Sequence, residues 1–215
     1  MNRFSKNSIF TVLFLLGSFY GFAQKKSKLL QTWDPKTLKQ ANTAIKYEGL
    51  TFQEKKVIYY INLVRMNGAL FAETYLKDYL HDWRVPRTKY VRSLIKTLKE
   101  LPSLPPLQPD DDLIKEAKKH AKEMGKSGKK GHRSLDGKGY TERMTKLKEK
   151  YKKIKELNQY GLPEALEIVI DLLLDEGVES LTHRRALLTP KYQYIGVGLT
   201  YHKKWGTNCS ILLAY

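Results

Sequence analysis

The feature that most constrains the fold is an apolar segment near the C-terminus, residues 163–176. Pro163 suits the first turn of a helix, and Gly177 suits the position just after its end. The apolar side chains between them cover most of the helical circumference: Ala165, Leu166, Ile168, Val169, Ile170, Leu172, Leu173 and Leu174. A helix that is apolar on most sides must be buried on several sides. We therefore expect it to lie inside a layered domain.

Other helices are predicted before this segment. Thr51 and Glu54 form a capping-box signature at the start of the first one. Apolar residues recur at helical spacing over residues 52–66, 70–83, 88–98 and 110–124. Four prolines within residues 101–109 exclude a helix there, so this stretch is expected to be a rigid, extended connector.

The last third of the sequence combines helical and strand patterns. Residues 140–154 alternate in charge with few apolar side chains, which predicts a weak, exposed helix. A short helix is expected over residues 180–188. Residues 192–201 and 208–215 are rich in β-branched and aromatic side chains and flank a turn, so they predict an antiparallel hairpin. The fold class is therefore α+β, with helices first and a C-terminal β-hairpin, or an α/β/α layering.

The N-terminus has the pattern of a secretory signal peptide. A basic start precedes an apolar run over residues 9–22, and Ala23 is a small residue suited to a cleavage site before Gln24. The alternative is a retained anchor, but the run is short for a membrane span of about 20 residues. No later segment is apolar enough to span a membrane. We predict a secreted or periplasmic protein with a signal peptide, an N-terminal lead-in and one domain over residues 1–23, 24–50 and 51–215.

Positive charge is concentrated in residues 115–155. The formal net charge is +17, and this segment holds sixteen Lys or Arg against five Asp or Glu. Outside the cytoplasm such a segment attracts anionic lipid, polyanionic glycans or other cell-envelope polymers. The alternative is a merely solvated basic surface. Nucleic acid is not an expected partner, because aromatic residues are scarce in the segment and export removes the protein from nucleic acids.

The sequence contains few signs of catalysis. Cys209 is the one cysteine, so no internal disulfide can form, and it is expected to be a small buried strand residue. Nucleotide-binding loops, a serine elbow and the H-E-x-x-H zinc signature are all absent. His120 lies on the apolar face of its helix and is expected to be a hydrogen-bonded core histidine. His132, Glu156 and His183 remain, and such residues either bind a divalent metal or form a proton-shuttling cluster.

Several stretches, in this order, resemble a known family. Ile61 to Arg65 resembles its N-x-x-R segment, and Leu113 to Met124 resembles its A-x-x-H-A-x-x-M helix, which Gly131 and His132 follow. Three later stretches agree as well, over residues 165–178, 183–192 and 195–198. Together they resemble the bacterial branch of the CAP superfamily, the SCP-domain proteins that include cysteine-rich secretory proteins, antigen 5 and pathogenesis-related proteins. The similarity covers residues 51–215.

This resemblance implies an α/β/α sandwich with a central cleft, into which two histidines and one or two acids point. The matching positions here are His132, His183, Glu156 and, nearest to the second acid, Asp175. In some members such a set binds zinc, so zinc is the cofactor that the resemblance implies; an uncoordinated cluster is the alternative. The sequence departs from the family pattern after the glutamate, at Leu157 and Asn158, and before the second histidine, at Thr182.

Three functions follow from these observations, and the sequence favours the first. It is a secreted binding module for a small-molecule or lipid ligand, or for an envelope surface. The second is a zinc-dependent or His/Glu-type hydrolase of peptides or esters, in which His132, Glu156 and His183 would be catalytic. The third is a structural protein with a non-catalytic histidine cluster.

Overall fold

The structure is a computed structural model that describes residues 32–215. The predicted signal peptide and its cleavage site lie outside the described residues. The chain divides into two compact units, residues 1–36 and 37–215. Residues 37–50, which the sequence suggests as a lead-in, belong to the second unit, since Asn62 Nδ2 donates to the carbonyl of Ala41 at 3.0 Å and Thr43 Oγ1 donates to that of Leu107 at 2.8 Å.

Helices and strands follow the order expected of an α+β domain. The helices of the first half are α2 (Pro35–Ala41), α3 (Phe52–Met66), α4 (Gly68–Phe71), the π-helix η1 (Ala72–Leu76), α5 (Lys77–Asp82), α6 (Lys89–Glu100) and α7 (Asp111–Ser127). The later ones are α8 (Tyr140–Arg143), the 3₁₀ helix η2 (Leu147–Glu149), α9 (Ala165–Leu174) and α10 (Thr182–Leu187). The strands are β1 (Gln108–Pro109), β2 (Ile154–Tyr160), β3 (Tyr194–His202) and β4 (Gly206–Ala214).

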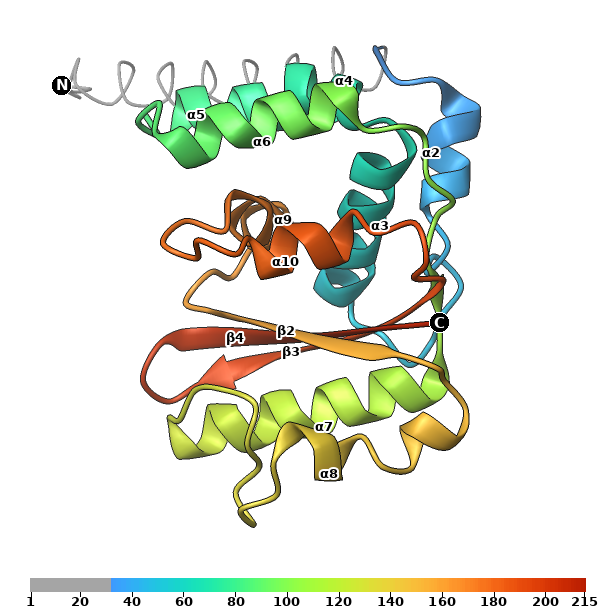
Figure 1. The fold of residues 1–215 in the computed structure, drawn as a ribbon, viewed down its shortest axis with the longest axis vertical. Helices are drawn as coiled ribbons and strands as arrows, with labels where there is room; N and C mark the ends of the chain where they lie inside the picture. The colour runs from blue at the N-terminus through green and yellow to red at the C-terminus, as the bar shows by residue number, and fades with distance from the viewer. Residues whose placement is uncertain (1–31) are drawn as a thin grey trace, which may run out of the picture. The chain divides into compact units, whose positions relative to one another are not determined.

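The four strands form one mixed sheet with helices on both faces (Figure 1). Its order is β1-β3-β4-β2, in which β1 runs parallel to β3 and the other pairs are antiparallel. Helices α7 and α8 cover one face, and α3, α9 and α10 cover the other (Figure 1). The predicted α+β class and C-terminal hairpin of β3 and β4 are confirmed.

Two glycines of β3 allow α7 to lie directly on the sheet. A Cβ added to Gly196 would stand 2.1 Å from the carbonyl carbon of Leu113. One added to Gly198 would stand 2.6 Å from that of Ala117. Contacts this short do not occur between real atoms, so any side chain at these two positions would push the helix away.

Buried polar side chains of α3 bind the backbone of the proline-rich connector and of the segment after α10. Arg65 is fully buried, and burial lowers the pKa of its guanidinium to about 10. It donates to four backbone carbonyls, those of Pro105, Leu187, Thr189 and Tyr192. Asn62 both donates to and accepts from the backbone of Leu107. These bonds satisfy groups that would otherwise be buried without a partner, and they hold the proline-rich connector against α3.

The prediction of a helix over residues 140–154 is wrong for most of its length. Only α8 and η2 are helical there, and Ile154 begins strand β2. The few apolar side chains of this segment are core residues: Met144 and Tyr151 pack in one cluster with Leu113 of α7. Burial of these side chains decides the path of the backbone, because the segment has too few of them to form a continuous helical stripe.

Candidate histidine–carboxylate site

The four predicted site residues form two pairs. His132, on the loop after α7, donates from Nδ1 to Oε1 of Glu156 at 2.8 Å. His183, in α10, donates from Nδ1 to Oδ1 of Asp175 at 2.7 Å. Within residues 32–215, no hydrogen bond or ion pair joins one pair to the other. The first pair belongs to the layer of α7 and α8, and the second to the layer of α9 and α10 (Figure 1).

The alternation of side chains along β2 places Glu156 on the face of the sheet that α7 covers. Ile154, two residues earlier, packs in the cluster of Leu113 and Met144, so Glu156 faces the same side of β2. Its carboxylate is buried, with Arg143 Nη1 at 3.0 Å from Oε1 and Nη2 at 2.6 Å from Oε2. This two-point geometry is the strong form of an arginine–carboxylate pair.

The surroundings keep Glu156 ionised. Burial alone would raise the pKa of its carboxyl group, but the hydrogen bonds from His132 and Arg143 outweigh burial and place the pKa below its ordinary value. Arg143 also donates to Glu116 at 3.0 Å and to the carbonyl of His132 at 2.8 Å. Arg143 therefore connects α8 with α7, β2 and the loop that carries the histidine.

His120, on α7, is hydrogen-bonded to the backbone of this loop. Its Nε2 donates to the carbonyl of Gly131 at 2.9 Å and lies 3.7 Å from Oε1 of Glu156. Burial lowers the pKa of the imidazole, so it is neutral at physiological pH. The expectation of a hydrogen-bonded core histidine is confirmed. Asn158 Nδ2 donates to the same carbonyl at 3.2 Å, so α7 and β2 both fix the backbone beside His132.

Asp175 is a helix cap as well as a partner of His183. It is buried, in the left-handed conformation with φ 52°. Its Oδ2 accepts from the backbone N–H groups of His183 at 2.8 Å and Arg184 at 3.3 Å. The carboxylate therefore satisfies the first amides of α10 while its other oxygen orients the imidazole.

Sequence reasoning missed Arg143, which lies in no motif and is one of sixteen basic residues in its segment. It noted Asn158 only as a departure from the family pattern. A buried arginine can be found from sequence only when its carboxylate partner is known, and here the partner is thirteen residues away on another element.

The arrangement has limited fit to a metal ion. A carboxylate on Nδ1 is the device that orients metal-ligating histidines, and it leaves Nε2 as the ring atom for a ligand. However, both oxygens of Glu156 already contact Arg143, whose positive charge beside the carboxylate disfavours a metal cation there. In the described part of the chain, no three or more His, Cys, Asp or Glu residues gather in a way that would hold a metal. The four residues thus form two pairs, in each of which a carboxylate orients an imidazole.

The remaining nucleophile of interest is buried. Cys209 lies on β4 with almost no exposure, and burial raises the pKa of its thiol. A thiol in this state is protonated and unreactive. The prediction of a small buried strand residue is confirmed.

Most of the positive charge of residues 115–155 is unpaired. Ion pairs join Lys118 to Glu54, Lys138 to Asp136, Arg143 to two glutamates, and Lys150 to two aspartates. Within residues 32–215, the other twelve of the sixteen basic side chains have no ion pair, and eleven of these twelve are exposed.

Helices on both faces of a small mixed sheet, with one histidine–carboxylate pair on each side of it, define an SCP-type α+β sandwich. The chain belongs to the CAP family, the cysteine-rich secretory protein family, whose sequence model matches residues 59–213. No curated protein is similar enough in sequence to match. No helix between residues 32 and 215 has the length and apolar character needed to cross a bilayer.

Two solved structures are similar to this one. An outer surface protein from Borrelia burgdorferi is 20% identical with a TM-score of 0.43, over 66% of this chain and 93% of that one. An extracellular protein of Bacillus anthracis that contains an SCP domain is 14% identical with a TM-score of 0.44, over 85% of this chain and 44% of that one.

Proposed function

We propose that this chain is an exported SCP-type binding module that attaches to an anionic component of the cell envelope. The observation that carries the proposal is the excess of unpaired, exposed basic side chains over residues 115–155. The acids of this segment do little to neutralise them. Glu116 pairs with the buried side chain of Arg143, and Glu142 accepts from the backbone N–H of Gly139 at 2.8 Å at the start of α8. A field of one sign persists on this side of the molecule and attracts polyanions.

The histidine–carboxylate pairs support binding more than hydrolysis. A general base needs a free lone pair and a pKa near the working pH. Glu156 is buried, Arg143 contacts both of its oxygens, and its pKa is below the ordinary value, so it is a weak base. The hydrolase that the sequence suggests as an alternative would also need His132 and His183 in one cluster, and their separate partners give that arrangement no support.

The test of this proposal is binding of the purified chain to vesicles of phosphatidylglycerol and of phosphatidylcholine, and to heparin, over a range of salt. We expect binding to the two anionic partners only. Raising the salt from about 0.01 M to 1 M shortens the Debye length from about 30 Å to about 3 Å, so the affinity should fall steeply. Equal binding to neutral vesicles, or no binding to any polyanion at low salt, would overturn the proposal.

Export has its own test. Expression in a bacterial host with a general secretion pathway should yield a shortened protein outside the cytoplasm. N-terminal sequencing of that protein should begin at Gln24. A chain that stays intact in the cytoplasmic fraction would contradict the export part of the proposal while leaving polyanion binding open to its own measurement.

A further inference from the structure

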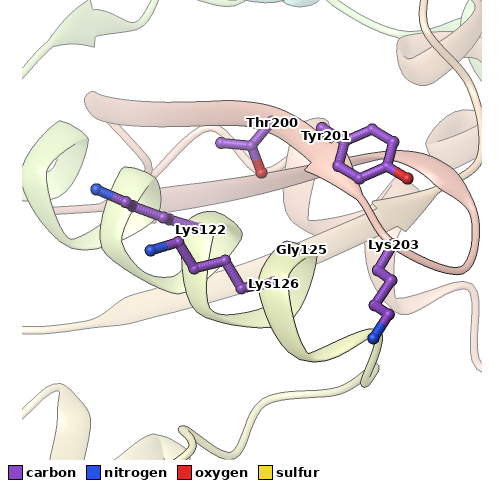
Figure 2. Close-up of a pocket in the computed structure, with 6 residues that line it drawn as sticks. All are labelled: Lys122, Gly125, Lys126, Thr200, Tyr201 and Lys203. Carbon is purple, nitrogen blue, oxygen red and sulfur yellow. The ribbon is translucent and has the colours of Figure 1, made fainter.

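Lysines from two distant segments of the chain meet where α7 ends. Lys122 and Lys126 lie on the last turns of this helix, and Lys203 and Lys204 lie on the turn between β3 and β4. The backbone N–H of Lys203 donates to the carbonyl of Gly125 at 2.9 Å, which holds the hairpin turn against the helix. Figure 2 shows Lys122 and Lys126 on α7, with Lys203 on the adjoining turn.

Glycine makes this contact sterically allowed. A Cβ on Gly125 would stand 2.2 Å from the carbonyl oxygen of Tyr201. Gly128 ends the helix in the left-handed conformation with φ 69°, and its own added Cβ would be 3.7 Å from Cβ of Lys204. The two lysine-bearing segments can therefore approach each other through their backbones.

One buried histidine fixes the geometry of the turn. Nδ1 of His202 accepts from the backbone N–H groups of Lys204 at 3.2 Å and Trp205 at 3.1 Å. Its Nε2 therefore carries the proton, and it donates to the carbonyl of Lys129 at 3.0 Å. The hairpin turn and the loop after α7 are thus joined by a single ring, so their side chains are presented on a rigid frame.

Six exposed lysines gather on this frame: Lys122, Lys126, Lys129, Lys130, Lys203 and Lys204. None of them forms an ion pair with an acid in the portion of the chain that the structure describes. Two aromatic side chains project beside them, Tyr201 with 71% and Trp205 with 43% of its surface exposed. We call these eight residues the hairpin patch.

Part of the hairpin patch lines a shallow pocket of about 310 Å³, whose wall is formed by Lys122, Gly125, Lys126, Thr200, Tyr201 and Lys203 (Figure 2). The side chains of three lysines thus line one depression, which has room for an anionic headgroup. On the same hairpin turn as Lys203, the Trp205 ring has Nζ of Lys130 at 4.2 Å from its centre, a cation–π distance. The indole therefore stands next to positive charge at the tip of the hairpin.

We propose that the hairpin patch is the surface by which this protein docks on an anionic lipid bilayer. The lysines contact lipid phosphates, and Tyr201 and Trp205 enter the headgroup boundary. Exposed amphipathic rings favour this boundary, where one end of the ring is apolar and the other is hydrated. A soluble polyanion would be bound by the lysines alone and gives no role to two exposed rings on one hairpin. This inference rests on the proposed function and names its partner.

The first experiment compares two triple variants of equal charge in vesicle binding. Lys126→Gln, Lys203→Gln and Lys204→Gln are combined in the test variant, and Lys89→Gln, Lys96→Gln and Lys99→Gln on α6 in the control. Each lysine near an anionic leaflet strengthens binding about fivefold, so the test variant should bind phosphatidylglycerol vesicles about a hundredfold more weakly. The control should change less than about threefold, because its charges are screened at distances beyond a Debye length. Equal losses in both variants would overturn the inference.

The second experiment asks whether Trp205 reaches the bilayer. Brominated lipids should quench part of the tryptophan fluorescence of the wild-type protein, and the Trp205→Phe variant should lose that quenching. Thermal unfolding of every variant is the control for stability, and we expect these exposed substitutions to leave the melting temperature unchanged. If the lysine variant loses binding but Trp205 is not quenched, the partner is a soluble or wall polyanion and bilayer docking is wrong. If the wild type binds no polyanion at all, the proposed function itself fails.

Discussion

The guanidinium of Arg143 contacts both carboxylate oxygens of Glu156, at 3.0 and 2.6 Å, beneath the exposed ring of His132. Through this contact the carboxylate stabilises the structure around His132. It neutralises the arginine, which in turn donates to the carbonyl of His132. The His132–Glu156 pair is therefore part of a buried ionic network that fixes a loop, and its chemistry is that of orientation more than proton transfer.

We expect Arg143→Met to be strongly destabilising. It would leave Glu156 buried without its main partner, which costs about 3–5 kcal/mol in comparable pairs. Urea unfolding followed by circular dichroism measures the change. Lys146→Met, at an exposed residue of the same segment, is the matched control and should stay within about 0.5 kcal/mol of wild type. A similar small effect for both variants would show that the network contributes little.

Because α7 approaches β3 closely, substitution by alanine should destabilise the protein at Gly198 but not at Gly49. Gly198→Ala places a Cβ 2.6 Å from backbone atoms of α7, so the helix must shift, at a cost of about 1–3 kcal/mol. Gly49→Ala meets nothing closer than 3.9 Å and should be neutral or slightly stabilising. Thermal unfolding of the two variants tests this. Equal melting temperatures would mean that the helix and the strand are not in direct contact.

Buried His120 predicts a dependence of stability on pH. Burial lowers the pKa of its imidazole from the ordinary 6.5. As the pH falls below 6.5, the unfolded chain binds a proton at this residue that the folded protein does not bind. The free energy of unfolding therefore decreases with falling pH, by at most about 1.4 kcal/mol per pH unit from this group.

The His120→Gln variant keeps a donor for the carbonyl of Gly131 but cannot titrate. Its unfolding free energy should fall less steeply than that of wild type between about pH 6.5 and pH 5, on urea titrations at matched ionic strength. Parallel curves for the two proteins would show that His120 does not contribute to the acid sensitivity.

Because His132 and His183 have separate carboxylate partners, we expect weak binding of zinc. Stable zinc sites use about three or four protein ligands, and Glu156 is held by Arg143. We expect the protein to retain less than one zinc ion per chain after dialysis, by elemental analysis. His132→Ala and His183→Ala should leave that content unchanged. A stoichiometric zinc content that disappears in either variant would show that the two imidazoles converge on one ion.

Local signals in the sequence were sufficient for much of the fold. The capping box of Thr51 and Glu54 marks the start of α3 through residues only three positions apart, and both of its hydrogen bonds are present in the structure. The asparagine and arginine of α3 were noted as a family pattern, but their role as ties to the connector became visible only through Leu107 and its neighbours. Strand β2 was not predicted, because Glu156 and Asn158 look like surface residues until their partners on the loop after α7 and on α8 are known.

The helices with strong apolar periodicity, the hairpin and the family could all be predicted from the amino-acid sequence, because their signals lie in short stretches of the chain. Three features became visible only in the folded molecule: Arg143 neutralises Glu156, Asp175 caps α10, and lysines of α7 meet those of the hairpin turn. Charge pairing and burial depend on distances in space between residues on different helices, strands and loops. Spacing along the chain does not encode them.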